Sequence, residues 1–235
     1  MSKEYFQFKQ FKVFHDKCAM KVGTDGVLLG TLTETQNSKQ ILDIGTGTGL
    51  IALILAQRTD AQIDAVEIDN EAANQSGFNF SISPWSKRLS SFHSSIFDFK
   101  NDKKYDLIVS NPPYFINSLK SEGKKKEIAR HVDDEFFLNL CKKIEEFLAD
   151  NGTCWIILPV IEMEHFTKEA LKMGLNHIKS IEIHSFDHSP VKRIIRSFSR
   201  EKDIEPEAYK FIIYDSPGKH SSQYKNIAKD FLSIF

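Results

Sequence analysis

Four consecutive residues, Asn111-Pro112-Pro113-Tyr114, carry groups that suit recognition of an amine on a planar ring. They follow the apolar run 105–110, which predicts a buried strand whose carboxyl end leads directly into Asn111. Two consecutive prolines fix φ and push the preceding residue out of the helical region, so the segment is stiff. The prolines offer carbonyl acceptors without N–H donors, and Asn111 adds a side-chain amide beside them. Taken alone, the tetrapeptide also fits an ordinary strand-terminating turn.

A second candidate site is the glycine turn 45–49, which lies between an apolar strand and the apolar run 50–56. A strand, a glycine turn and a helix in this order bring a nucleotide-like ligand against bare backbone and a helix N-terminus. The next predicted strand ends at Glu67, about 20 residues past the turn, where a carboxylate can accept hydrogen bonds from both ribose hydroxyls. The pattern therefore predicts a nucleoside-containing cofactor.

The glycine spacing argues against NAD as that cofactor. The turn reads Gly-x-Gly-x-Gly, whereas the dinucleotide fingerprint has two residues between its last two glycines. Asp43, just before the turn, also fits poorly beside a pyrophosphate because like charges repel. It suits a cationic amino group, and S-adenosylmethionine carries an amine, a sulfonium and a ribose. A tight turn without a ligand is the alternative interpretation, and the matching Glu67 argues against it.

Residues 43–49, Glu67 and residues 111–114, in that order, resemble the class I S-adenosylmethionine-dependent methyltransferases that act on exocyclic or amide nitrogen. The run 6–30 is similar to the opening of the bacterial tRNA(Val) adenine-N6 methyltransferases, which modify adenine 37, immediately 3′ of the anticodon. Shorter likenesses continue to residue 235, so the resemblance covers nearly the whole chain.

This resemblance implies S-adenosylmethionine as cofactor, tRNA as substrate and a defined set of site residues. The catalytic residues would be Asn111, Pro112, Pro113 and Tyr114. The cofactor-binding residues would be Thr24, Asp43, Gly45, Gly47, Gly49, Glu67, Ser95, Ile96 and Asn111.

One departure from the family pattern concerns the residue that meets the adenine amine of the cofactor. The family usually has an acidic residue after the third strand, and Ser95 stands there in this chain. A serine hydroxyl can accept the same hydrogen bond, though more weakly than a carboxylate. Asp98, three residues on, is the other candidate for this contact.

The order of predicted elements defines the fold class. Strands alternating with helices indicate a parallel, doubly wound sheet. The expected fold is therefore α/β, Rossmann-like, with a mostly parallel seven-stranded sheet and an antiparallel edge hairpin formed by 178–183 and 194–198. The stretch 209–214 offers a further strand. The other predicted strands lie near 40–45, 62–67, 89–94, 105–110 and 152–158, and amphipathic patterns predict helices over 134–149 and 162–173.

Length indicates one large domain with an N-terminal extension. The 235 residues can bury a substantial core. We expect residues 1–39 to form a lid and connector segment and residues 40–235 to form the class I methyltransferase domain.

Charge limits how RNA can be bound. The net charge is −1, so the chain is not a broadly basic nucleic-acid binder and any tRNA contact must be local. One basic cluster lies in the polar stretch after the tetrapeptide, and a second lies along the predicted edge strand with Arg196 and Arg200. Phosphate contacts need basic side chains on a shared face; the alternative is a solvated loop and an ordinary charged strand face. The residues expected to contact RNA are Lys124, Lys125, Lys126, Arg130, Lys192 and Arg193.

Cysteine usage and the absence of targeting patterns indicate a cytoplasmic protein without a membrane anchor. Cys18, Cys141 and Cys154 are odd in number and lack metal-ligand spacing, so we expect free thiols and no metal. No signal-peptide pattern or long apolar span is present. The oligomeric state stays open, with a monomer as the working expectation.

Three alternatives to RNA adenine-N6 methylation follow from the same motifs. Protein glutamine N5-methyltransferases share the tetrapeptide but carry a sizeable helical N-terminal domain, whereas about 39 residues precede the first strand here. DNA adenine methylation normally adds a target-recognition insertion, for which there is no spare length. A non-catalytic RNA-binding scaffold would not need the intact set of Asp43, Glu67 and Asn111.

Overall fold

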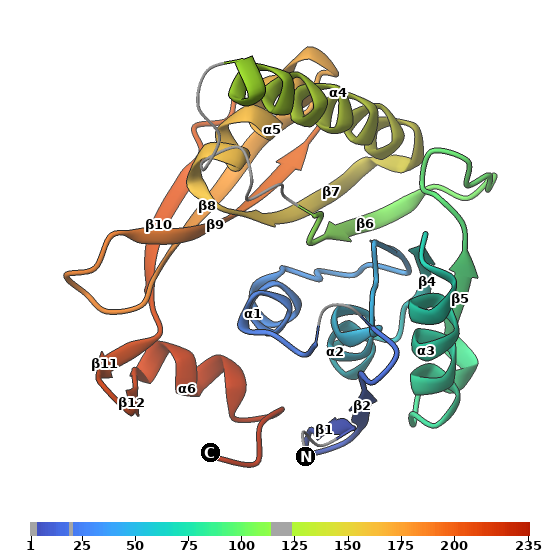
Figure 1. Cartoon of the computed structure of the whole chain (residues 1–235), viewed down its shortest axis with the longest axis vertical. Helices are drawn as coiled ribbons and strands as arrows, with labels where there is room; N and C mark the ends of the chain where they lie inside the picture. Colours follow the sequence, from blue (N-terminus) through green and yellow to red (C-terminus); the bar gives the residue numbers. More distant parts are fainter. Residues whose placement is uncertain (1–3, 19–20, 114–123) are drawn as a thin grey trace.

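The computed structural model of the chain describes residues 4–18, 21–113 and 124–235, with side chains from residue 135 onward in the last range. An eight-stranded sheet forms its centre, in the order β10-β8-β9-β7-β6-β3-β4-β5 (Figure 1). All neighbouring strands are parallel except at β9, which is antiparallel to both β7 and β8. Its strands are β3 (Gln40–Ile44), β4 (Gln62–Glu67), β5 (Leu89–His93), β6 (Tyr105–Ser110), β7 (Leu148–Leu158), β8 (Asn176–His184), β9 (Val191–Ser199) and β10 (Glu207–Ile212).

The doubly wound α/β class is confirmed, but the expected strand count and the position of the hairpin need correction. The run 209–214 supplies β10, which pairs in parallel with β8 and makes an eighth strand. The antiparallel pair β8–β9 therefore lies inside the sheet instead of at its edge. Phe211 of β10 is 3% exposed, so this strand joins the sheet because it brings an aromatic ring into the core.

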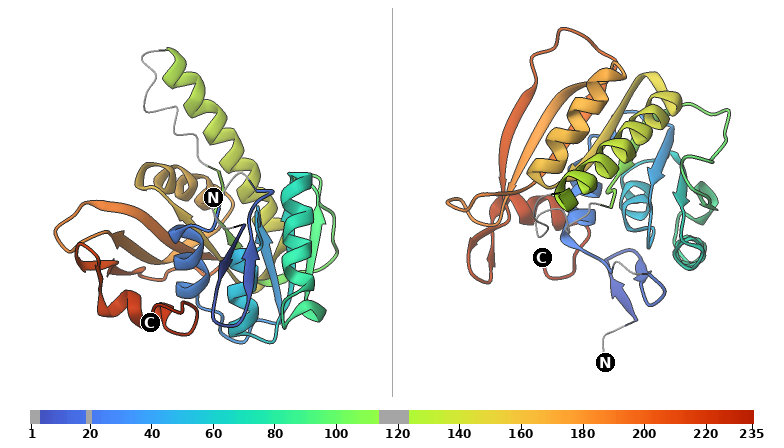
Figure 2. Two further views of the ribbon diagram at one scale, coloured as in Figure 1. Left: turned by 60° about the horizontal axis from the view of Figure 1, so that its bottom comes forward. Right: turned by 45° about the horizontal axis from the view of Figure 1, so that its top comes forward.

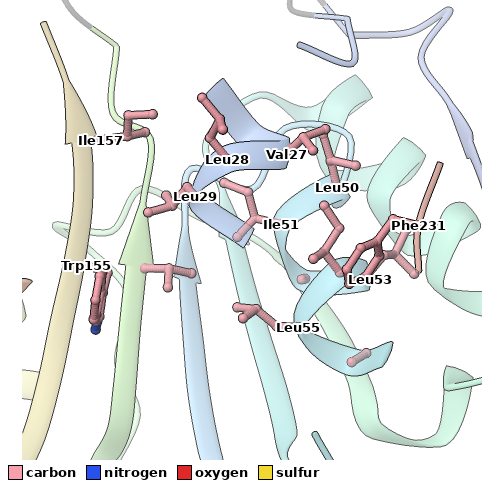
Figure 3. Close-up of a cluster of buried hydrophobic side chains, with 14 of the residues drawn as sticks. Val27, Leu28, Leu29, Leu50, Ile51, Leu53, Leu55, Trp155, Ile157 and Phe231 are labelled. Carbon is pink, nitrogen blue, oxygen red and sulfur yellow. The ribbon is translucent and has the colours of Figure 1, made fainter. Parts of the chain in front are cut away.

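Helices lie on both faces of the sheet (Figure 1), and the buried side chains form two hydrophobic clusters. Helices α1, α2 and α6 pack in the first cluster, and α4 and α5 pack in the second. Figure 3 shows Val27, Leu28 and Leu29 of α1 against Leu50 and Ile51 of α2. The helices are α1 (Thr24–Leu32), α2 (Leu50–Arg58), α3 (Asn70–Ser81), α4 (Lys124–Phe147), α5 (Val160–Lys172) and α6 (Ser222–Ala228), with a short 3-10 helix at Ser86–Arg88.

The N-terminal segment shares this core. A hairpin of β1 (Tyr5–Gln7) and β2 (Lys12–Phe14) places Phe8, Phe11 and Val13 in the same cluster as α1. A second small hairpin, β11 (Tyr214–Ser216) with β12 (Lys219–His220), precedes α6. The separation of a lid from the main domain at residue 39 stays a prediction.

Helix α4 is longer than its apolar stripe indicated. It begins at Lys124, ten residues before the expected start near 134, so the lysines 124–126 lie in its first turn and not in a loop. Phe137 is the first buried residue among the described side chains of α4. The amino-terminal part of the helix extends beyond the sheet (Figure 2). Within the described residues, no helix combines the length and the apolarity that crossing a membrane requires.

Candidate active site

The strand order reverses between β3 and β6, and the two sequence motifs meet at that point. Ile44 of β3 is the register partner of Ser110 of β6, and the Ser110 hydroxyl donates to the Ile44 carbonyl at 2.8 Å. The glycine turn and Asn111 therefore leave adjacent strand ends. Ligands of open α/β sheets bind at such a switch point, outside the carboxyl ends of the strands.

A cavity of about 480 Å³ lies between these two motifs. Asn111, Pro112 and Pro113 form one side, and the amino-terminal end of α2 forms another. The segment before α1 and the first turn of that helix form a third side, so the expected Thr24 lies in the cavity wall. The lining residues are Lys21, Gly23, Thr24, Asp25, Gly26, Gly45, Thr46, Gly47, Thr48, Leu50, Ile51, Asn111, Pro112 and Pro113.

The three glycines of the turn have different roles. All three have positive φ, which favours glycine. A Cβ added at Gly45 or Gly47 would meet nothing within 4 Å, so these two positions leave open space next to the cavity. A Cβ at Gly49 would lie 2.5 Å from Phe80 Cε1. Gly49, which was expected to bind the cofactor, lines neither this cavity nor the smaller slot beside it. Gly49 instead packs closely against Phe80 of α3.

Asp43 lies beneath the turn and is fully buried. The Thr46 hydroxyl donates to Asp43 Oδ2 at 2.6 Å, while Oδ1 has no hydrogen-bond partner among the described residues. Burial is the main cause that raises the pKa of Asp43 to about 7. Asp43 lines neither this cavity nor the smaller slot beside it. A buried carboxylate oxygen without a partner is costly, and a cationic group bound above the turn would lower that cost by attraction through the turn, which suits the amine of S-adenosylmethionine.

Glu67, at the end of β4, is bonded to the turn. Its Oε2 accepts from Gly47 N at 2.8 Å, and its Oε1 accepts from Asp69 N at 3.0 Å. A carboxylate can accept about four hydrogen bonds, so both oxygens keep capacity for ribose hydroxyls. Glu67 does not itself line the cavities, but its neighbours Val66 and Ile68 do.

A smaller slot of about 110 Å³ adjoins the cavity and shares Gly45, Pro112 and Pro113 with it. Ser95 and Ile96, both expected to bind the cofactor, line this slot, and Asp98 does not. Phe136 and Leu140 of α4 close its other side. At well below the roughly 300–1,000 Å³ of a complete ligand pocket, the slot can hold only part of a ligand.

The expected RNA-binding residues do not gather in one described patch. Arg193 is bonded to Asp25 through Nε at 2.8 Å, and Asp25 belongs to the cavity wall. Arg196, expected on the same charged face, is 9% exposed beneath α5 and contacts Thr167 and Glu164. The pairing of β9 with β8 is irregular at Val191–Arg193, so regular side-chain alternation does not hold there, and RNA contact by Lys192 and Arg193 stays a prediction. Lys192 remains exposed.

Part of the expected site cannot be placed. Tyr114 lies outside the described residues. The side chains of Lys124, Lys125, Lys126 and Arg130 lie outside the described side chains, although their backbone belongs to α4. In the described part of the chain, no group of three or more His, Cys, Asp or Glu residues could hold a metal ion.

Sequence reasoning missed Asn79, which joins the N-terminal segment to the glycine turn. Asn79 is fully buried on α3 and donates to the carbonyls of Phe14 and Thr48 at 2.9 and 2.8 Å. Its Oδ1 accepts from Phe14 N at 2.9 Å. One turn earlier, Gln75 Oε1 accepts from Lys17 N at 2.6 Å. Two side-chain amides spaced four apart, in the stretch between two predicted strands, are the signal that could have found this pair.

Comparison with known proteins agrees with this geometry. The model of the methyltransferase small domain family matches residues 12–184. A protein of Parabacteroides distasonis named tRNA1(Val) (adenine(37)-N6)-methyltransferase is 41% identical over 98% of each chain. Proteins with the same name from Bacteroides fragilis and Pedobacter heparinus are 43% and 42% identical, over 98% and 99% of this chain and 98% and 100% of theirs.

Solved structures show the same fold at low identity. A predicted O-methyltransferase from Agrobacterium tumefaciens superposes with a TM-score of 0.69 at 13% identity, over 88% of this chain and 96% of its own. A methyltransferase from Pyrococcus furiosus gives a TM-score of 0.60 at 22% identity, over 80% and 87%. These likenesses concern the fold alone.

Proposed function

The chain belongs to the methyltransferase small domain family, and we propose that it transfers a methyl group from S-adenosylmethionine to N6 of adenine 37 in tRNA(Val). The placement of Asn111 and Pro112 across one cavity from the glycine turn carries the methyl-transfer part of the proposal. The near full-length relatives named for tRNA adenine-37 methylation support the choice of nucleotide.

The different parts of the cofactor can be assigned to the larger cavity and to the slot beside it. The amine end would lie in the larger cavity near Gly45 and Gly47, above the unpartnered Asp43 oxygen. Glu67 would bind the ribose between the two spaces, and the purine would enter the slot of Ser95 and Ile96. We also propose that residues 1–39 cover this site, because Lys21 and residues 23–26 already form one cavity wall.

The chemistry asked of the protein is modest. Adenine N6 is a poor nucleophile because its lone pair is delocalised into the ring. The Asn111 side-chain oxygen and the Pro112 carbonyl would accept hydrogen bonds from its two N–H groups, which favours a pyramidal nitrogen. Because positive charge develops on that nitrogen, both bonds strengthen in the transition state and lower the barrier.

The bound cofactor supplies an electrophilic methyl group on sulfur. That methyl group would be transferred to N6, S-adenosylhomocysteine would leave with the electron pair of the carbon–sulfur bond, and the methylated nitrogen would lose its proton to water. The protein holds the acceptor in line with the methyl group, so no strong base is required. Tyr114 is proposed to stack on the target base, which must leave the anticodon stack to reach the cavity.

The proposal describes a cytoplasmic enzyme that acts as a monomer. Its test is parallel incubation of the protein and labelled cofactor with total tRNA, a peptide-chain release factor and DNA. Label in tRNA alone supports the proposal. Label in the release factor would favour glutamine methylation instead, and no label in any substrate would favour a non-catalytic scaffold.

A further inference from the structure

The slot beside the glycine turn has no charged side chain among its described lining residues. Its wall consists of aliphatic, aromatic, proline, glycine and serine residues. The lining residues are Ile44, Gly45, Val66, Ile68, Ser94, Ser95, Ile96, Phe97, Ser110, Pro112, Pro113, Phe136 and Leu140. Among the described side chains of the wall, a ligand group in this slot can therefore meet polar atoms only at the three serines.

Each of these serine hydroxyls already has a partner within the protein. Ser94 Oγ donates to Ser95 O at 2.9 Å, and Ser110 Oγ donates to Ile44 O at 2.8 Å. Ser95 Oγ accepts from Phe97 N at 3.2 Å. The slot consequently offers a neutral hydroxyl as its strongest side-chain acceptor, and that hydroxyl is already engaged in its own turn.

The carboxylates near the slot do not line it, and two of them accept hydrogen bonds from the protein backbone. Glu67 accepts from Gly47 N and Asp69 N, and Asp69 Oδ1 caps α3 by accepting from Ala72 N at 2.8 Å. Asp98 is exposed and does not line the slot. None of these three carboxylates belongs to the slot wall.

Apolar surface is what the slot does offer. Ile68 is 68% exposed and Phe97 is 39% exposed, although both are large apolar side chains at the slot wall. Phe97 meets Phe136 of α4 edge to face, with ring centroids 5.9 Å apart. A planar ring that covered these side chains would gain binding energy from apolar burial and ring contacts.

We propose that the purine of the cofactor is held here by apolar contact and shape, without a charged acceptor for its 6-amino group. We further propose that the serine at position 95 is the reason why the slot tolerates a purine that lacks this amino group. The inference rests on the proposed function, because it assumes that the slot receives the purine. It predicts that the protein discriminates weakly between cofactors that differ only at purine C6, and that a carboxylate at position 95 introduces discrimination.

The test compares S-adenosylhomocysteine with its 6-deamino analogue, in which purine replaces adenine. Both are titrated calorimetrically into the wild-type protein, Ser95→Asp, Ser95→Ala and Phe97→Ala. Wild type and Ser95→Ala should bind the two ligands with affinities within about threefold, as expected for loss of one weak neutral hydrogen bond. Ser95→Asp should prefer the amino ligand by about tenfold or more, since a charged acceptor is stronger.

The variant Phe97→Ala distinguishes binding through apolar contact from binding through a hydrogen bond at purine C6. Phe97→Ala should weaken both ligands by the same factor, because the lost contact does not involve C6. A tenfold or larger loss for the deamino ligand with wild type would overturn the inference, and so would a Ser95→Asp variant with native thermal stability and no preference. If S-adenosylhomocysteine itself fails to bind wild type, the proposed function fails first.

Discussion

Gly47 donates its backbone N–H to the Glu67 carboxylate at 2.8 Å, which joins the glycine turn to the end of the neighbouring strand. The contact spans the 20 residues between the two motifs. It places a negative charge beside the turn, between the slot and the larger cavity, where the ribose of the cofactor is proposed to lie.

We expect Glu67→Gln to weaken cofactor binding. The variant keeps the size of the side chain and a neutral acceptor but removes the charge, which weakens the hydrogen bonds to ribose hydroxyls by about 1–1.5 kcal/mol. Calorimetry with S-adenosylhomocysteine measures this change. The matched control is Glu71→Gln, an exposed carboxyl in the first turn of α3, which should leave affinity unchanged. Equal affinity for wild type and Glu67→Gln would remove Glu67 from the site.

Asp43 predicts a specific pH dependence of stability. Burial raises its pKa to about 7, so the folded protein holds this proton more tightly than the unfolded chain does. Between about pH 4 and 7 the folded state therefore binds more protons, and this group's contribution to stability falls as the pH rises through that window. Above about pH 7, Asp43 is ionised in the folded protein, and its buried charge lowers the free energy of unfolding.

Asp43→Asn should consequently stabilise the protein most at pH 8 and by clearly less at pH 5, where only the first part of the loss has accumulated. One pKa unit corresponds to about 1.4 kcal/mol, so a gain of a few kcal/mol is expected in the unliganded protein. Thermal unfolding at the two pH values measures it. Cofactor affinity should fall in the same variant, because the amine loses its anion. A variant destabilised equally at both pH values would contradict the raised pKa.

Asn111→Ala should reduce turnover on the order of a hundredfold or more while cofactor affinity stays close to wild type. The lost acceptor acts mainly in the transition state, so kcat falls more than binding does. Single-turnover methyl transfer and calorimetry give the two values. Near-normal transfer by the alanine variant would mean that the tetrapeptide is only a rigid turn.

The lysines at the start of α4 should contribute to tRNA binding through phosphate contacts. Replacing Lys124, Lys125 and Lys126 together by glutamine should weaken tRNA binding and flatten its salt dependence, because fewer counterions are released. Lys142→Gln, an exposed lysine nearer the other end of the same helix, is the control. Parallel plots of log affinity against log salt for wild type and the triple variant would rule out these contacts.

Much of the fold could be predicted because the elements around the site have strong local patterns. The β-branched runs before Gly45 and Asn111 are continuous, and the glycine turn has few other uses. The eighth strand was less visible because Glu207–Lys210 carry no buried side chain and only Phe211 enters the core. The beginning of α4 was missed for a related reason, since a helix that extends past the sheet needs no apolar stripe there.

The position of the site could be predicted where a motif ends a strand, and Gly47 and Asn111 do lie at one cavity. Their roles, and that of Asp43, stay predictions. The separate role of Gly49 could not be predicted, because its glycine requirement comes from Phe80, about 30 residues away in sequence. The pairing of Arg193 with Asp25 and the bonds of Asn79 also join distant segments, and local sequence carries no record of such contacts.

The most direct measurement of the central claim uses tRNA(Val) transcripts that differ at one nucleotide. Wild-type protein and labelled S-adenosylmethionine are incubated with transcripts carrying adenine or guanine at position 37, and the digested nucleosides are identified by mass spectrometry. The account predicts N6-methyladenosine from the adenine transcript alone. Methylation of both transcripts, or of neither while cofactor binding is intact, would contradict it.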